Sequence, residues 1–97
     1  MKLSTETILT TLREQLPYLE EHFGVTQLAL FGSYARGDFD DASDIDILIK
    51  LKKKDYELRF FLKEHLESVF HKNVDVVYFD SLRPFVKRSV EKDVIYA

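Results

Sequence analysis

The sequence contains no cysteine, and its three glycines and two prolines are few for a chain of 97 residues. Without cysteine the chain has no disulfide framework, no zinc–thiolate site and no thiol nucleophile. The scarcity of glycine and proline, together with the lack of repeats and low-complexity tracts, leaves no candidate for a linker between domains. We therefore expect a single domain over residues 1–97.

Long apolar runs are missing as well. The longest apolar stretches are a few residues, far below the ~20 residues that a membrane-spanning helix needs. The first residues, MKLSTETILTTLREQL, carry Thr, Arg, Glu and Gln where a signal peptide would have its apolar run. These two absences favour a cytoplasmic protein that does not associate with membranes.

A basic excess is also absent, because the formal net charge is −3. Proteins that bind nucleic acid through its phosphates usually carry an excess of positive charge. Four lysines do cluster, in an expected turn between a strand and a helix, where a solvated connection is the favoured interpretation. They are Lys50, Lys52, Lys53 and Lys54. Direct binding of nucleic acid is therefore not expected.

The chain does have apolar and aromatic bulk, since 45% of its residues are hydrophobic and it contains eight Phe and five Tyr. This richness excludes intrinsic disorder. A chain of this size buries somewhat over ~60% of its unfolded surface. One core is therefore within reach without a disulfide or a structural metal.

Hydrophobic residues recur at intervals of three and four from Ser4 to Phe23, which predicts a helix. Ser4 is the expected N-cap, and Gly24 is suited to end the helix in the left-handed conformation. Pro17 lies inside this pattern and is expected to kink the helix or to divide it in two.

Three short apolar segments are expected to form strands: Val25–Phe31, Asp44–Leu51 and Val74–Phe79. The second segment alternates strictly between apolar residues and a more polar set, as in a strand whose two faces have different surroundings. Its apolar face comprises Ile45, Ile47, Ile49 and Leu51, and its other face comprises Asp44, Asp46, Leu48 and Lys50.

Three further helices are expected: a short one within residues 32–37, a long one over 55–70 with Asp55 as N-cap, and a last one capped by Asp80 and Ser81 with Pro84 in its first turn. Residues 94–96 are expected to form a short terminal strand or an extended tail. The apolar face of the long helix comprises Leu58, Phe61, Leu62, Leu66, Val69 and Phe70.

The resulting order, α-β-α-β-α-β-α, predicts an α+β fold. The helices are expected to pack mainly on one face of a small sheet. The other face is expected to keep the acidic residues.

Three features of this pattern point to chemistry: the turn at Gly32 and Ser33, the pair Asp44 and Asp46, and Asp75 inside an apolar strand. Residues i and i+2 of a strand lie about 6.6 Å apart and point the same way. Their carboxylates can converge on hard cations such as Mg²⁺. Two such metals would clamp the oxygens of a phosphoryl or nucleotidyl displacement, and Asp75 would accept the proton of the attacking hydroxyl.

The glycine and serine suit the anionic end of such a substrate. Gly32 lets the backbone approach a phosphate closely, and Ser33 offers a hydroxyl and exposed N–H groups at the start of a short helix. Taken singly, a Gly-Ser turn, an Asp-x-Asp pair or a strand aspartate is usually structural. Together they favour function, because three clustered carboxylates repel one another without a cation.

The segment GSYARGDFDDASDIDILI resembles the Gly-Ser-x10-Asp-x-Asp signature of the nucleotidyltransferase superfamily, which includes DNA polymerase beta and aminoglycoside nucleotidyltransferases. The ten-residue spacing matches, as do the Ala-Arg-Gly after Gly-Ser and the Ser before the first Asp. The short length and the flanking pattern resemble the minimal nucleotidyltransferase (MNT) family, whose members are antitoxins, often paired with a HEPN-domain toxin that acts as an RNase. The resemblance extends from Phe23 to the end of the chain.

This resemblance implies a mixed sheet flanked by helices, with Gly32 and Ser33 at the nucleoside triphosphate. It implies that Asp44, Asp46 and Asp75 are catalytic and ligate two Mg²⁺ ions. Arg36 matches an arginine of the family and is a candidate nucleotide-binding residue. Its role stays open between contact with phosphate and an ion pair with Asp44 or Asp38 that orders the loop.

The leading hypothesis is a nucleotidyltransferase that transfers AMP from ATP to a hydroxyl, expected to be a tyrosine, of a HEPN toxin. Only 22 residues follow Asp75, so the acceptor is expected on a separate molecule that docks over the acidic face. Two alternatives stay open: an antitoxin that acts by binding alone, and a transferase for small molecules of the aminoglycoside type. No base-recognition residue is evident, so the choice between ATP and other nucleotides also stays open.

Overall fold

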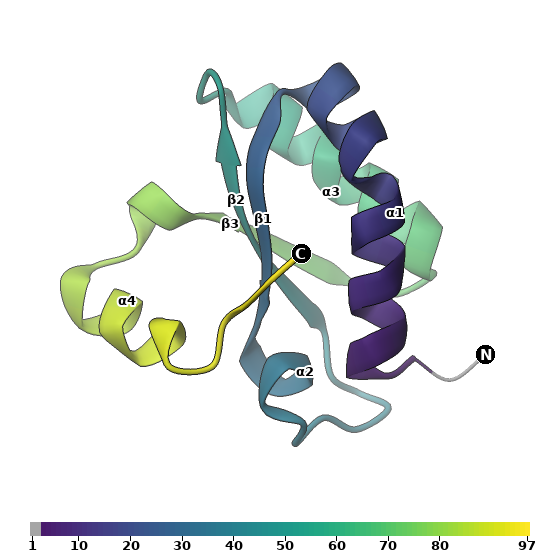
Figure 1. The fold of residues 1–97 in the computed structure, drawn as a ribbon, viewed down its shortest axis with the longest axis vertical. Coiled ribbons are helices and arrows are strands. Elements are labelled where there is room, and N and C mark those ends of the chain that lie inside the picture. The colour runs from purple at the N-terminus through teal and green to yellow at the C-terminus, as the bar shows by residue number, and fades with distance from the viewer. Residues whose placement is uncertain (1–2) are drawn as a thin grey trace.

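A computed structural model describes residues 3–97 of the chain (Figure 1). The expected order of elements is confirmed, and the terminal segment forms a fourth strand. In chain order the elements are α1 (Thr5–Phe23), β1 (Val25–Phe31), α2 (Gly32–Arg36), β2 (Ile45–Leu51), α3 (Tyr56–Phe70), β3 (Val74–Tyr78), the 3₁₀ turn η1 (Phe79–Ser81), α4 (Pro84–Glu91) and β4 (Ile95–Tyr96).

The four strands form one mixed sheet in the order β3-β2-β1-β4. β2 runs parallel to β3 and antiparallel to β1, and β1 also pairs antiparallel with β4. The fold is therefore α+β, as the sequence predicts. Its registers place Asp46 of β2 opposite Phe31 of β1 on one side and opposite Asp75 of β3 on the other.

The main core lies between one face of the sheet and the helices α1 and α3, which both cover that face (Figure 1). Its fully buried residues come from both helices and from the strands β1, β2 and β3. They include Ile8, Leu12, Leu19, Ile45, Ile47, Ile49, Leu62 and Leu66. The alternation predicted for β2 is confirmed, because its isoleucines face this core.

The opposite face of the sheet carries a smaller apolar cluster. Ala29, Leu48 and Phe79 are buried there, and the half-buried Val90 and Val94 pack against them. Figure 1 shows α4 on this side of the sheet, away from α1 and α3. The helices thus lie mainly, but not entirely, on one face.

α1 has the predicted caps. Ser4 accepts a hydrogen bond of 3.1 Å from the backbone N–H of Thr7, and Gly24 ends the helix in the left-handed conformation at φ 69°. Of the two outcomes expected for Pro17, a kink or a division of the helix, division is wrong, because α1 continues through it. Pro17 is exposed, so its missing N–H costs one helical hydrogen bond at the surface, while Leu12 and Leu19 anchor both sides. No helix within residues 3–97 is long and apolar enough to cross a membrane.

α3 begins after Asp55, as predicted, and the Asp55 carboxylate accepts hydrogen bonds from the first turn. Its apolar face is narrower than predicted, because the side chain of Phe61 is 53% exposed. Phe61 instead contacts Phe60 edge to face at the surface, with ring centroids 5.6 Å apart. The buried stripe of α3 consists of Leu62, Leu66 and Phe70.

The predicted cap of the last helix is also wrong. Asp80 and Ser81 belong to η1, and α4 begins at Pro84 with Arg83 as an N-cap that makes no side-chain hydrogen bond. The proline ring disfavours helical backbone in the residue before it, and Arg83 accordingly has ψ 150°. The expected place of Pro84 in the first turn is confirmed.

β3 is an edge strand whose outward backbone groups are bonded by side chains of α3. Arg59 donates to the carbonyl of Val76 at 2.8 Å, and the Glu67 carboxylate accepts from the N–H of Val74 at 3.2 Å. These bonds attach β3 to the helix beside it as well as to β2.

A pair of variants tests the position of the α3 stripe. We expect Leu62→Ala to lower the free energy of unfolding by about 2–5 kcal/mol, because it leaves a cavity in the core. Phe61→Ala is expected to cost roughly 1 kcal/mol or less, since it loses one surface ring contact. Urea denaturation followed by circular dichroism measures both, and equal losses would contradict the observed face.

Candidate active site

The Gly-Ser turn lies where β1 ends and α2 begins. Gly32 has φ +74°, a left-handed backbone that residues with a Cβ rarely adopt. A Cβ added to Gly32 would overlap the carboxylate of Asp46, with its Cγ only 2.9 Å away. Gly32 is therefore required for backbone conformation and because Asp46 lies directly against it.

Asp46 and Asp75 face each other across neighbouring strands. The parallel register pairs them, and residues paired in a sheet project from the same face. That face is opposite α1 and α3, because Ile45, Ile47 and Val76 are buried toward those helices. The sheet thus brings together the end of β1 and the two carboxylates.

Asp44 lies one residue before β2 and is exposed, whereas Asp46 is half-buried. Asp44 still adds negative charge to the site, because it is one of the groups that act on Asp46. The structure therefore brings Gly32, Asp46 and Asp75 into close proximity, with Asp44 at the margin.

Burial raises the pKa of Asp46 from its ordinary value of 3.8 to about 6. The negative charges of Asp75 and Asp44 and a hydrogen bond with Asp75 raise the pKa further, and the charge of Arg36 opposes them. Since like charges this close disfavour joint ionisation, the site without a cation retains a proton at a pH where an isolated aspartate is charged.

The donor set of the site consists of carboxylate oxygens, which are the ligands that Mg²⁺ takes. Within residues 3–97, however, no three His, Asp or Glu side chains lie together in an arrangement that could hold a metal ion. Asp46 and Asp75 are the close pair, and Asp44 does not complete a cluster of three with them. The carboxylate ligands are of the type that binds a divalent cation, but their present arrangement does not form a complete metal-binding site.

Arg36 forms an ion pair with Asp38, with Nε 3.1 Å from the carboxylate oxygen. Of the two pairings considered from the sequence, the structure contains this one. Both side chains are exposed, so solvent screens the pair and it opens easily. The positive charge of Arg36 is also felt at Asp46.

The loop between α2 and β2 is more ordered than its polar sequence suggests. The Asp40 carboxylate accepts from the N–H of Ala42 at 2.9 Å, and the Asp40 N–H donates to the Ser43 hydroxyl at 2.9 Å. The role of these two residues in ordering the turn before Asp44 is not among the predictions from the sequence. The signal was present, because Asp and Ser often hydrogen-bond to backbone two or three residues away.

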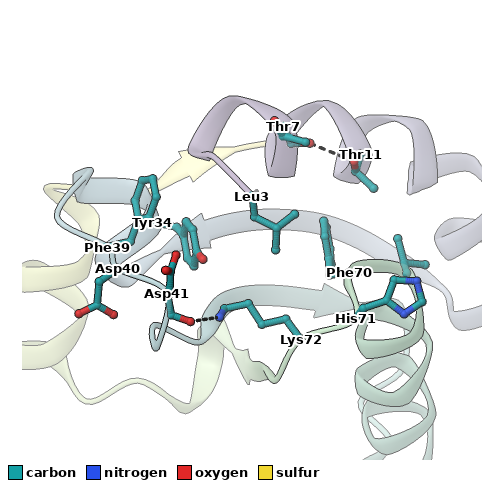
Figure 2. A pocket seen from close by; sticks show the side chains of 11 residues that line it. Leu3, Thr7, Thr11, Tyr34, Phe39, Asp40, Asp41, Phe70, His71 and Lys72 are labelled. Carbon is teal, nitrogen blue, oxygen red and sulfur yellow. Dashed lines mark hydrogen bonds between the residues drawn. The ribbon is translucent and has the colours of Figure 1, made fainter. Parts of the chain in front are cut away.

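A cavity of about 570 Å³ lies behind this loop, on the side of α1 and the end of α3. Figure 2 shows Lys72 reaching across its lower side to Asp41, where Nζ donates to the backbone carbonyl at 2.8 Å. The stacked rings of Tyr34 and Phe39, 4.4 Å apart, form one end. Neither the Gly-Ser turn nor the acidic residues of the site line this cavity, so the candidate chemistry lies on a separate, open face.

The family model for the nucleotidyltransferase domain matches residues 12–97. This span includes the Gly-Ser turn and all three acids. The chain belongs to the nucleotidyltransferase domain family.

Relatives of this nucleotidyltransferase are similar to it over nearly their whole length. It is 38% identical to MJ0128 of Methanocaldococcus jannaschii, a candidate protein adenylyltransferase, over 99% of each chain. It is 37% identical to the protein adenylyltransferase MntA of Thermococcus cleftensis, over 94% of this chain and 90% of the relative.

Solved structures agree with the fold. A candidate minimal nucleotidyltransferase has a TM-score of 0.79 at 30% identity, covering 96% of this chain and 95% of that one. A toxin–antitoxin structure with AMP-PNP has a TM-score of 0.69 at 27% identity, covering 97% and 72%. A complex of a tri-AMPylated HEPN toxin with an MNT antitoxin from Shewanella oneidensis has a TM-score of 0.60 at 25% identity, covering 95% and 66%. The resemblance to minimal nucleotidyltransferases that the sequence predicts is confirmed.

Two glycine variants test the contact between the turn and Asp46 in this nucleotidyltransferase. Gly32 and Gly37 both have positive φ, but a Cβ at Gly37 would meet nothing within 4 Å. We expect both alanine variants to lose about 1–2 kcal/mol of stability from the strained backbone. If Mg²⁺ with ATP raises the Tm of the wild type, only Gly32→Ala should lose that rise, because it displaces Asp46. Equal loss in Gly37→Ala would contradict this assignment.

The raised pKa of Asp46 predicts a pH dependence of stability. Between about pH 4 and pH 6 the folded chain keeps a proton that the unfolded chain has released, so this group makes the fold less stable as pH rises through that window. We expect Asp46→Asn to remove this decline, so that the variant gains Tm over the wild type at pH 7.5 and loses that advantage near pH 4. Thermal melts without divalent cations, with Asp80→Asn as an exposed control, measure this. An equal gain at both pH values would contradict it.

Proposed function

We propose that the protein is a Mg²⁺-dependent protein adenylyltransferase that transfers AMP from ATP to a tyrosine hydroxyl of a HEPN-domain toxin and thereby acts as its antitoxin. The observation that carries this proposal is the pairing of Asp46 with Asp75 directly against Gly32. An acidic pair beside a backbone turn that can approach phosphate suits nucleotidyl transfer.

Each residue of the site has a role in this reaction. Gly32 and Ser33 hold the triphosphate through backbone N–H groups and the serine hydroxyl. Asp44, Asp46 and Asp75 would hold the metal. Bound Mg²⁺ supplies charge neutralisation on the triphosphate and orients the attacking and leaving oxygens.

The transfer forms one bond and breaks one. The acceptor hydroxyl oxygen bonds to the α-phosphorus of ATP, and the bond from that phosphorus to the pyrophosphate oxygen breaks. Asp75 takes the proton of the attacking hydroxyl as general base. Arg36 leaves its weak pair with Asp38 and contacts phosphate, since a surface ion pair is readily exchanged for a charge-assisted bond to phosphate.

The partner follows from the relatives rather than from the site alone. Relatives that are protein adenylyltransferases, and a structural neighbour in complex with a tri-AMPylated HEPN toxin, support a toxin as acceptor. Each added AMP carries negative charge and bulk. On a tyrosine near an RNase site these would hinder the approach of RNA.

Intact-mass spectrometry of the protein encoded beside this chain's gene tests the proposal. The neighbouring protein is co-expressed with the wild-type chain or with an Asp44→Ala/Asp46→Ala variant. We expect a mass gain in whole AMP units with the wild type and none with the variant. With purified proteins, chelation of Mg²⁺ by EDTA should abolish the gain, and peptide mapping should place it on tyrosine.

Other outcomes would contradict the proposal in distinct ways. An unchanged mass in a stable one-to-one complex would assign the chain to antitoxins that act by binding alone. Modification of the partner by the double variant would show that Asp44 and Asp46 are not needed for the transfer. Modification on residues other than tyrosine would support AMP transfer but contradict the proposed tyrosine acceptor.

A further inference from the structure

Helix α4 carries apolar side chains that no other part of residues 3–97 covers. Phe85 is 78% exposed and Val86 is 42% exposed, and no residue of this eight-residue helix is fully buried. Single exposed apolar residues are common in folded proteins. An aromatic ring almost wholly in water at the first turn of a helix is a stronger feature, because aromatic anchors dominate interfaces.

α4 stands on the same side of the sheet as the acidic site. Val90 and Val94 pack on Leu48, which follows Asp46 by two residues on β2 and therefore shares its face. Figure 1 shows the helix on that side, opposite α1 and α3. Asp93, just after α4, also acts electrostatically on Arg36, as Asp46 does. A molecule that reaches the acids from solvent therefore passes close to α4.

The exposed side of α4 is positively charged. Residues 83–92 contain four basic side chains and one acidic side chain, in a chain whose net charge is −3. The basic residues are Arg83, Lys87, Arg88 and Lys92. Within residues 3–97 the ion pairs found are Arg36 with Asp38 and Lys63 with Glu67, so the cations of this segment have no carboxylate partner there.

Helical spacing places the aromatic ring and two of the cations together. Phe85, Arg88 and Lys92 are separated by three and four residues and so lie along one side of the helix, extended by one residue past its end. We call this set the α4 docking face. An aromatic side chain flanked by Arg and Lys is complementary to an apolar pocket on a partner protein that is surrounded by carboxylates.

RNA is the other macromolecule that an aromatic ring with cations would suit. It is disfavoured here, because a polyanion that reached α4 would also lie close to Asp46, Asp75 and Asp93 on the same side of the molecule. A protein surface meets no such general repulsion, since its charges can be placed to face the cations alone.

We propose that the α4 docking face binds the acceptor protein, through an apolar pocket on that protein surrounded by Asp and Glu side chains. This inference rests on the proposed function, because it assigns the surface that holds the acceptor while its hydroxyl reaches the acidic site. Docking at α4 raises the acceptor's local concentration at the acids and takes no part in the transfer itself.

Steady-state AMP transfer to the purified protein encoded by the neighbouring gene tests this assignment. We expect Phe85→Ala and Arg88→Glu/Lys92→Glu each to raise the KM for the acceptor about tenfold or more, with kcat, the KM for ATP and the Tm unchanged. The wild-type KM should rise with salt, and the charge-reversed variant should lose most of that dependence. The matched controls are Phe60→Ala, whose ring is 53% exposed on α3, and Lys52→Glu/Lys53→Glu in the exposed turn after β2.

The outcomes separate this inference from the function on which it rests. Wild-type transfer with an unchanged acceptor KM in both α4 variants would overturn the docking face and leave the transferase intact. An equal rise in acceptor KM in the control variants would also overturn it, because the rise would then not be specific to the α4 docking face. Loss of binding to a labelled single-stranded RNA, with the acceptor KM unchanged, would assign α4 to RNA instead. No transfer by the wild type would overturn the proposed function and this inference with it.

Discussion

Two carboxylates stand side by side in this fold because β2 and β3 run parallel in a register that pairs Asp46 with Asp75. Most other features of the site depend on this register. A slip of one residue would turn the acid of one strand to the opposite face, into the apolar layer under α1 and α3. Burial is the main cause of the raised pKa of Asp46, and the pairing with Asp75 raises that pKa further. The closeness of Asp46 to Gly32 depends on the second register of β2, which pairs Asp46 with Phe31 of β1.

This register is stabilised by apolar packing on the opposite face of the sheet, under α1 and α3. Ile45, Ile47 and Ile49 are fully buried under the helices, and each such side chain stabilises the fold by about 1.5–3 kcal/mol. The repulsion on the other face is weakened by solvent, because Asp46 is half-buried and Asp75 is exposed. Arg59 and Glu67 add hydrogen bonds from α3 to the free edge of β3, which resist its sliding along β2. Apolar packing on one face thus makes a charged arrangement on the other face tolerable.

The sequence predicts the parts of the site that depend on local rules. Alternation in β2 predicts the face of the sheet on which Asp46 lies. The Gly-Ser turn predicts where the backbone can approach a phosphate closely. The sequence does not predict that Asp46 pairs with Asp75 while Asp44 stays apart, because that depends on contacts between strands distant in the chain. The errors have the same origin. Phe61 satisfies the helical spacing but falls beyond the edge of the sheet-facing stripe, and Pro17 is tolerated because it faces water.

The two charged features of the acid-bearing side, the carboxylates and the cations of α4, do not neutralise each other. Arg36 pairs with Asp38 rather than with Asp46, and among residues 3–97 no basic residue of α4 forms an ion pair. A site neutralised by its own arginine would hold a divalent cation weakly, and an α4 paired within the chain would have no charge left to attract an acceptor. Because both features stay unpaired, the negative charge is available to the proposed metal and the positive charge to the proposed acceptor.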